Sequence, residues 1–223
     1  MEIVILAVTK ASSDGSLFCI AGMNYQGQWI RPISKQSSGR FWTRQELTYQ
    51  SGAFVNVGEI WDVQGHAPKH FQHPNHTEDF ELSSHNYVRD MSNAELMAFL
   101  EQHCEGQAAL SDVFSANRRS TCLVKVDLFD AQITRFEDKK PKPKMTFRAR
   151  GLNLRNPHTN NGDIVVKDCK WEALVLQRAP YPARYNHIYL CIGLATIFNG
   201  IEHPQVIGLH TEPAVSMLSS YPD

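Results

Sequence analysis

The sequence contains no hydrophobic run long enough to cross a membrane as a helix. Its longest apolar stretch, residues 188–198, has 11 residues, whereas a membrane-spanning helix needs about 20. The chain begins Met-Glu and continues into an apolar segment, with no basic segment before it and no small-residue cleavage site behind it, so a secretion signal is not indicated. We therefore expect a cytoplasmic protein without membrane contact.

Cysteine is scarce and scattered. The chain has 5 cysteines, an odd number, and no two of them form a C-x-x-C pair: Cys19, Cys104, Cys122, Cys169 and Cys191. This pattern is typical neither of a disulfide framework nor of a zinc ribbon. We expect buried thiols in a reducing compartment.

Catalytic and cofactor motifs are missing as well. The sequence has no G-x-S-x-G, H-E-x-x-H, phosphate-binding P-loop or dinucleotide-binding G-x-G-x-x-G motif. Cys19 or Cys191 could pair with a histidine, but their apolar neighbours favour inert core thiols. Glu78 and Asp168 could act as an acid or a base, although we favour a role in holding arginines. We therefore expect a protein without enzymatic activity and without a cofactor.

Histidine is concentrated in one segment. Four of the 10 histidines, His66, His70, His73 and His76, fall within eleven residues. Spaced histidines can bind zinc, but two intervening prolines prevent the helix that would align them, and thiolates are absent. We interpret the segment as a polar connecting loop and expect no metal.

Short apolar runs, rich in Val, Ile, Phe and Tyr and bounded by turn residues, recur along the 223 residues. They predict a mainly β protein without a β-α-β rhythm. Several short strands in about 110 residues fit a small barrel, and two such blocks fit two consecutive small β-barrels. The expected strands cover residues 3–8, 17–23, 29–33 and 59–63 in the first half, and 121–129, 131–136, 145–150, 163–166, 187–194 and 205–210 in the second.

One helix is strongly indicated between the two halves. Ser92 and Glu95 form a capping box, and apolar residues follow on one face. We expect a helix over residues 92–103 within a first barrel at 1–105, followed by a second barrel at 115–223.

Two weaker signals concern local structure. Thr43 and Glu46 form a second capping box, which predicts a turn or two of helix. Residues 137–144 contain two prolines and four lysines, and we predict a mobile loop there because proline removes ladder donors and like charges repel.

Two neighbouring strands carry a recognisable pattern. Lys10 is followed by CIAG at residues 19–22 and by GQWIRPIS at residues 27–34. This combination resembles the prokaryotic dual OB-containing domain family, whose strongest signature is a C-(I/V)-A-G strand followed by G-x-W-I-R-P-(V/I)-S. Weaker matches are the HTED segment at residues 76–79, where the family has T-E-N, and residues 123–126, 147–148, 166–168, 171–172 and 190–194.

The resemblance implies two OB-fold barrels, recognition of nucleic acid or nucleotides, and an association with mobile-element and antiviral defence systems. OB barrels bind single strands by combining a basic groove with aromatic faces. On a strand, Trp29 and Arg31 share one face, and with Lys10 they form the constellation that we expect to bind. The alternative is that Trp29 lies in the core and Arg31 holds a carboxylate such as Glu78.

The second half adds basic residues. Residues 1–117 carry a net charge of -6 and residues 118–223 one of +5, with eight lysines and arginines between residues 135 and 155. Arg148 and Arg150 share one face of an expected strand and could contact phosphates, while Trp171 could stack on a base. A solvated charge run without a partner is the alternative.

These observations lead to one hypothesis with two alternatives. The hypothesis is a non-catalytic prokaryotic accessory or defence protein that recognises DNA or RNA, single-stranded or structured. The first alternative is a sensor of a small nucleotide or modified base, and the second is an adaptor that binds a protein partner through the acidic first half. The expected binding residues are Lys10, Trp29, Arg31, Glu78, Arg148, Arg150, Asp168 and Trp171.

Overall fold

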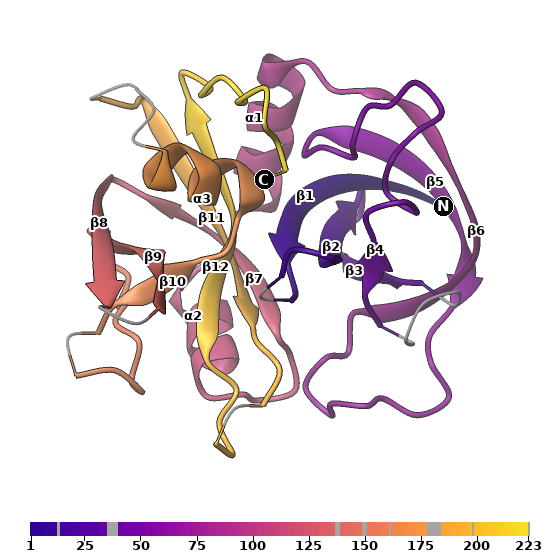
Figure 1. The fold of residues 1–223 in the computed structure, drawn as a ribbon. Coiled ribbons are helices and arrows are strands. Elements are labelled where there is room, and N and C mark those ends of the chain that lie inside the picture. Colours follow the sequence, from indigo (N-terminus) through magenta and orange to yellow (C-terminus); the bar gives the residue numbers. More distant parts are fainter. Residues whose placement is uncertain are drawn as a thin grey trace.

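The computed structural model describes the chain except for residues 13, 35–39, 137–138, 149–150, 161, 178–183, 198 and 223, and except for the side chains of residues 128–150 and 176. Two six-stranded sheets and three short helices make up the described part (Figure 1). The mainly β fold class predicted from the sequence is confirmed.

The first sheet is formed by β1 (Glu2–Lys10), β2 (Leu17–Asn24), β3 (Trp29–Ile33), β4 (Trp42–Thr43), β5 (Glu59–His66) and β6 (Asp79–Asp90). The second is formed by β7 (Thr121–Val126), β8 (Leu128–Phe136), β9 (Lys139–Arg148), β10 (Ile164–Val166), β11 (His187–Leu194) and β12 (Pro204–Glu212). The helices are α1 (Asn93–His103), α2 (Gln107–Phe114) and α3 (Cys169–Leu176).

The two sheets share one strand order. In the first, β1-β2-β3-β6-β5 closes on itself because β5 pairs with β1, and the β3–β6 pair is parallel. In the second, the order is β8-β9-β10-β12-β11-β7, and the β10–β12 pair is parallel. Only one residue separates β7 from β8. When these two are counted as one bent strand, the second order repeats the first, as in OB-like Greek-key barrels.

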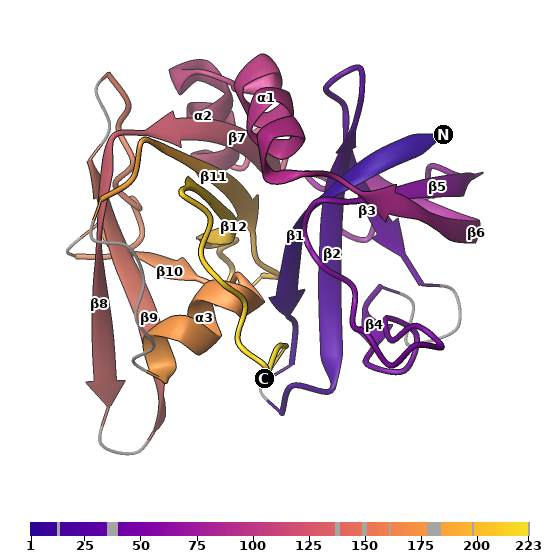
Figure 2. The ribbon, with the colours of Figure 1, turned by 90° about the horizontal axis from the view of Figure 1, so that it is seen from above.

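Three buried clusters form the core. One fills the second barrel and one fills the first. The third lies between them and joins residues of both sheets, such as Leu6 and Cys191, with the buried face of α1. Figures 1 and 2 show β1 and β12 side by side at this seam, and β1 contacts β12 directly. At Gly208 the approach is so close that an added Cβ would lie 2.3 Å from the Leu6 carbonyl oxygen.

The observed helices agree only in part with those predicted from the sequence. The expected helix is confirmed as α1, and both hydrogen bonds of the Ser92–Glu95 capping box are present. The short helices α2 and α3 were not predicted; α2 and α1 lie on the same side of the molecule (Figure 2). None of the helices in the described residues is long and apolar enough to span a membrane.

Two local expectations need correction, and one long strand was not predicted. The Thr43–Glu46 hydrogen bonds form, but the segment is a turn, because the chain soon becomes extended and pairs at Thr48 and Phe54. Residues 139–144 are not a loop but part of β9, whose pairing with β10 is limited to two positions. Its prolines therefore lie where β9 pairs on one side only, as prolines in strands require. The long strand β6 was missed because most of its residues are exposed and polar.

Candidate ligand-binding site

A pocket of about 170 Å³ opens at the seam between the two barrels. Residues of β1, β2 and β3 line one side, and residues of β7, β11 and β12 line the other. Ala7, Ala21, Gly193 and Ala195 are among its lining residues. The polar and basic lining residues are Thr9, Lys10, Cys19, Arg31, Arg40, His76, Thr121, Lys167, Thr196 and Gln205.

Arg31 forms the buried wall of this pocket, and its position follows from strand pairing. The parallel β3–β6 ladder places Arg31 opposite Asp79, and Nε of Arg31 lies 3.1 Å from Oδ1 of Asp79. The same guanidinium pairs with the carboxylate of Glu78 and donates to Oγ of Ser120, 2.5 Å away in the second half. Arg31 is only 6% exposed. Arg31 therefore pairs with carboxylates, which is the alternative considered in the sequence analysis, and it also contacts the second barrel through Ser120.

His76 lies beside two guanidiniums. Its Nδ1 contacts Nη1 of Arg31 at 2.8 Å and also contacts Nη2 of Arg40. Because guanidinium N–H groups only donate, Nδ1 is the acceptor and the proton is on Nε2. That nitrogen lies 3.0 Å from the carboxylate of Glu202, which comes from the second half. The cluster thus has members from both barrels.

The charge states in the cluster follow from burial. Burial lowers the pKa of His76 far below its ordinary value, and the positive charges of Arg31 and Arg40 lower it further. The imidazole is therefore neutral. Burial raises the pKa of Asp79, while the same two guanidiniums oppose that shift. Burial also raises the pKa of the Cys19 thiol, so this pocket residue is a thiol rather than a reactive thiolate.

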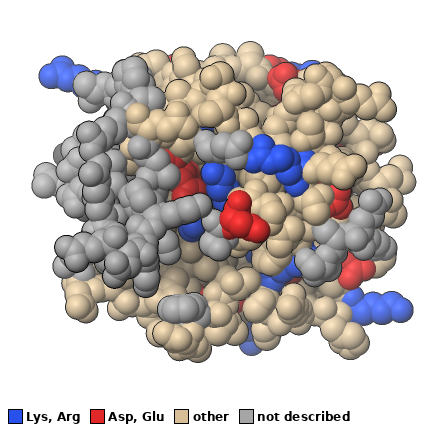
Figure 3. All heavy atoms as spheres, viewed as in Figure 1, with Lys and Arg blue, Asp and Glu red and all other residues tan. Residues whose placement is uncertain are grey.

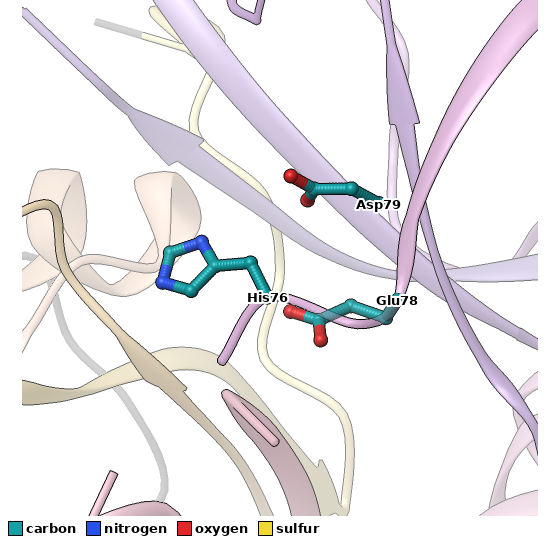
Figure 4. Close-up of side chains that lie close together, drawn as sticks. All are labelled: His76, Glu78 and Asp79. Atoms are coloured by element: carbon teal, nitrogen blue, oxygen red, sulfur yellow. The ribbon is translucent and has the colours of Figure 1, made fainter. Parts of the chain in front are cut away.

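His76, Glu78 and Asp79 have the residue types of a metal site. Their ligand atoms lie within 4.8 Å of one another, and the side chains project to the same side of the chain (Figure 4). However, each of the three contacts the guanidinium of Arg31. A fixed positive charge already occupies the position where these ligands converge, so the residues do not fit a divalent cation.

Two lysines line the pocket from opposite barrels. Lys10 ends β1, and Lys167 follows β10 directly. Both are half-buried, and neither forms an ion pair with any residue that the structure describes. On the face seen in Figure 1, lysine and arginine side chains lie near the middle, with acidic side chains beside them (Figure 3).

The other expected binding residues lie apart from the pocket. Trp29 is half-buried, and its indole Nε1 lies 3.4 Å from Glu105. Asp168 caps α3 by accepting from the backbone N–H of Trp171 and also accepts from that of Leu209. Trp171 is fully buried, and its indole N–H donates to the carbonyl of Leu209. The structure leaves Trp171 no accessible face for a base, and it gives Asp168 a structural role.

The basic segment at residues 135–155 has one basic side chain that the structure describes, that of Arg155, which is exposed and does not line the pocket. Arg148 ends β9, but its side chain is not described, and Arg150 lies outside the described residues.

Of the four clustered histidines, His66 and His70 are exposed, and the ring of His73 lies near that of His76, with centroids 4.9 Å apart. Only His76 belongs to the buried cluster.

Sequence reasoning missed several members of the site, including His76 and Asp79, which it noted only as parts of the histidine-rich segment and of the HTED segment at residues 76–79. Arg40, Ser120 and Glu202 carry no local signal, because each becomes recognisable only when distant segments meet. Lys167 lay within the VKD match to the family at residues 166–168. The basic side chain within that match was the one signal in the sequence that could have identified it.

Comparison with known proteins agrees with this architecture. No curated protein and no solved structure matches the chain. The family model of the dual OB-containing domain matches residues 1–209, which covers the first barrel, the second barrel as far as the middle of β12, and every described residue of the pocket. The chain therefore belongs to the dual OB-containing domain family.

Proposed function

We propose that the protein recognises nucleic acid at the seam between its two OB-type barrels. The observation that carries this proposal is the pocket itself, which four basic side chains line from both barrels: Lys10, Arg31, Arg40 and Lys167. OB folds bind nucleic acid by combining basic grooves with apolar or aromatic contacts. The chain as a whole has a formal net charge of only -1, so the four basic side chains make this pocket locally rich in positive charge.

Phosphate contacts carry the binding in this proposal. Trp171 is buried and Trp29 is held against Glu105, so neither tryptophan supports the stacking expected from the sequence. Arg31 is fully engaged by carboxylates and Ser120, which makes it a positioning residue. The two lysines remain to meet a phosphate, whereas Arg40 is buried and already contacts His76 and Asp79. The apolar lining, which includes Ile20, is available to the sugar or base.

We propose that recognition occurs without catalysis. The histidine and carboxylates closest to the pocket are held by Arg31 and Arg40, which leaves them poorly placed to move a proton. A cytoplasmic location is supported by five free cysteines. The sequence resemblance further suggests a prokaryotic accessory role in defence or mobile-element systems, where a protein partner would also be expected.

Fluorescence anisotropy tests the proposal. The probes are labelled single- and double-stranded DNA and RNA oligonucleotides at about 50 and about 200 mM salt. If the protein neutralises three phosphates of a single strand, raising the salt from about 50 to about 200 mM should weaken binding about 20-fold. The double variant Lys10→Gln/Lys167→Gln should weaken binding at low salt and flatten the salt dependence.

Lys69→Gln is the matched control, because Lys69 is exposed and does not line the pocket. It should bind like the unaltered protein. Absence of binding to every oligonucleotide would overturn the proposal, as would tight binding that the double lysine variant leaves intact.

A further inference from the structure

Lys10 and Lys167 face each other across the seam, and the backbone fixes this arrangement. An isolated antiparallel bridge joins Thr9 of the first barrel to Asp168 of the second. In an antiparallel pair the residue after one partner lies opposite the residue before the other. Lys10 is therefore opposite Lys167, and both line the pocket.

Like charges directly opposite each other on paired strands destabilise the pairing. Neither lysine forms an ion pair with a described carboxylate. Asp168 is the nearest acid in sequence, but it is 2% exposed and accepts from the backbone N–H groups of Trp171 and Leu209. Arg40 in the pocket and Lys170 in α3 add positive charge near the pair, and Glu172 of α3 adds one negative charge without forming an ion pair with either lysine in the described residues. The unliganded seam thus concentrates positive charge that an anion would neutralise.

The size and charge of the pocket narrow the class of anion. A cavity of about 150 Å³ takes a benzene-sized molecule, so 170 Å³ admits one terminal group rather than a run of nucleotides. An internal phosphodiester carries one negative charge and needs chain exits on both sides. A phosphate monoester carries about -1.5 to -2 at neutral pH, which matches two opposed lysines.

We propose that Lys10 and Lys167 form a site for the terminal phosphate monoester of a nucleotide, and that this phosphate bridges the two barrels. The inference rests on the proposed function and specifies its ligand. The same chemistry has two sources, a free nucleoside monophosphate and the 5′ end of a strand. Apolar lining residues such as Ile20 and Ala195 are available to the attached nucleoside.

The test compares oligonucleotides of one sequence, labelled at the 3′ end, that carry either a 5′-phosphate or a 5′-hydroxyl. The 5′-phosphate form should bind at least about 10-fold more tightly. Lys10→Gln and Lys167→Gln should each bring that ratio close to one, while Lys69→Gln should preserve it. Nucleoside 5′-monophosphates and inorganic phosphate serve as unlabelled competitors. Competition by the monophosphates at matching affinity identifies the free nucleotide as the source, and competition by oligonucleotides alone identifies the strand end.

Lys167→Glu provides a second readout that does not depend on the labelled probe. It places opposite charges face to face, so it should raise the melting temperature of the unliganded protein by about 1–3 °C and abolish the phosphate preference. Equal binding of the phosphate and hydroxyl forms would overturn this inference while leaving nucleic-acid recognition in place. Failure of every oligonucleotide and nucleotide to bind would overturn both.

Discussion

His210 should make the stability of the protein depend on pH. It is 2% exposed on β12, and its Nε2 lies 2.8 Å from the carbonyl oxygen of Leu6 on β1. A carbonyl oxygen only accepts, so Nε2 carries the proton and donates across the seam. Burial lowers the pKa of His210 to about 3, and the charge of Lys170 contributes in the same direction.

The magnitude follows from linkage. In the unfolded chain a histidine binds a proton near its ordinary pKa of 6.5, whereas folded His210 stays neutral down to about pH 3. Stability contributed by the neutral side chain is therefore complete well above pH 6.5 and is lost as the pH falls below it. The loss should be about 1.4 kcal/mol at pH 5.5 and about 2.7 kcal/mol at pH 4.5.

The assay measures the free energy of unfolding in urea for the unaltered protein and for His210→Gln. Glutamine retains an N–H donor for the Leu6 carbonyl but does not titrate. Subtracting the two curves cancels every other titrating group, so the advantage of histidine over glutamine should shrink by about 1.4 kcal/mol between about pH 7.5 and about pH 5.5. Two parallel curves over that range would refute a neutral, buried His210.

Three substitutions test the packing described above, each by chemical unfolding. Arg31→Met leaves the carboxylate of Glu78 buried without its cation and should cost about 3–5 kcal/mol; a loss below about 1 kcal/mol would contradict a buried ion pair. Gly208→Ala brings a methyl group against the Leu6 carbonyl and should cost about 1–3 kcal/mol or more, and unchanged stability would mean that the barrels separate easily. Trp171→Phe removes the N–H that donates to the buried carbonyl of Leu209 and should cost about 1–3 kcal/mol. An almost unchanged stability would instead indicate that Trp171 faces solvent.

The sequence predicted the barrels better than the site, for physical reasons. Strand β3 and its neighbours were recognisable because alternating apolar residues and turn signals act locally. Strand β6 was not, because its exposed residues give no periodic apolar signal. The sequence analysis named Glu78 as a possible partner of Arg31, and the two side chains pair in the structure. The binding role expected of Arg31 stays a prediction.

The pocket depends on information that one sequence does not display. Ser120 lies 89 positions from Arg31, and Glu202 reaches His76 only because the two barrels pack together. The facing of Lys10 and Lys167 depends on the register of a single bridge. Trp171 could not be assigned to a core or to a surface by residue type alone, since tryptophan occurs in both.

The third hydrophobic cluster bears on whether the halves can exist separately. Val4, Leu6 and Met23 of the first sheet share that cluster with Leu123 and Tyr189 of the second, and near the C-terminus Tyr221 donates to the carbonyl oxygen of Val55 in the first half. Cutting the chain between the sheets would expose this apolar face on both fragments. Each half contains all the strands of its own barrel. Because the third cluster is buried only when both halves are present, we expect the two barrels to fold as one cooperative unit rather than as two interchangeable modules.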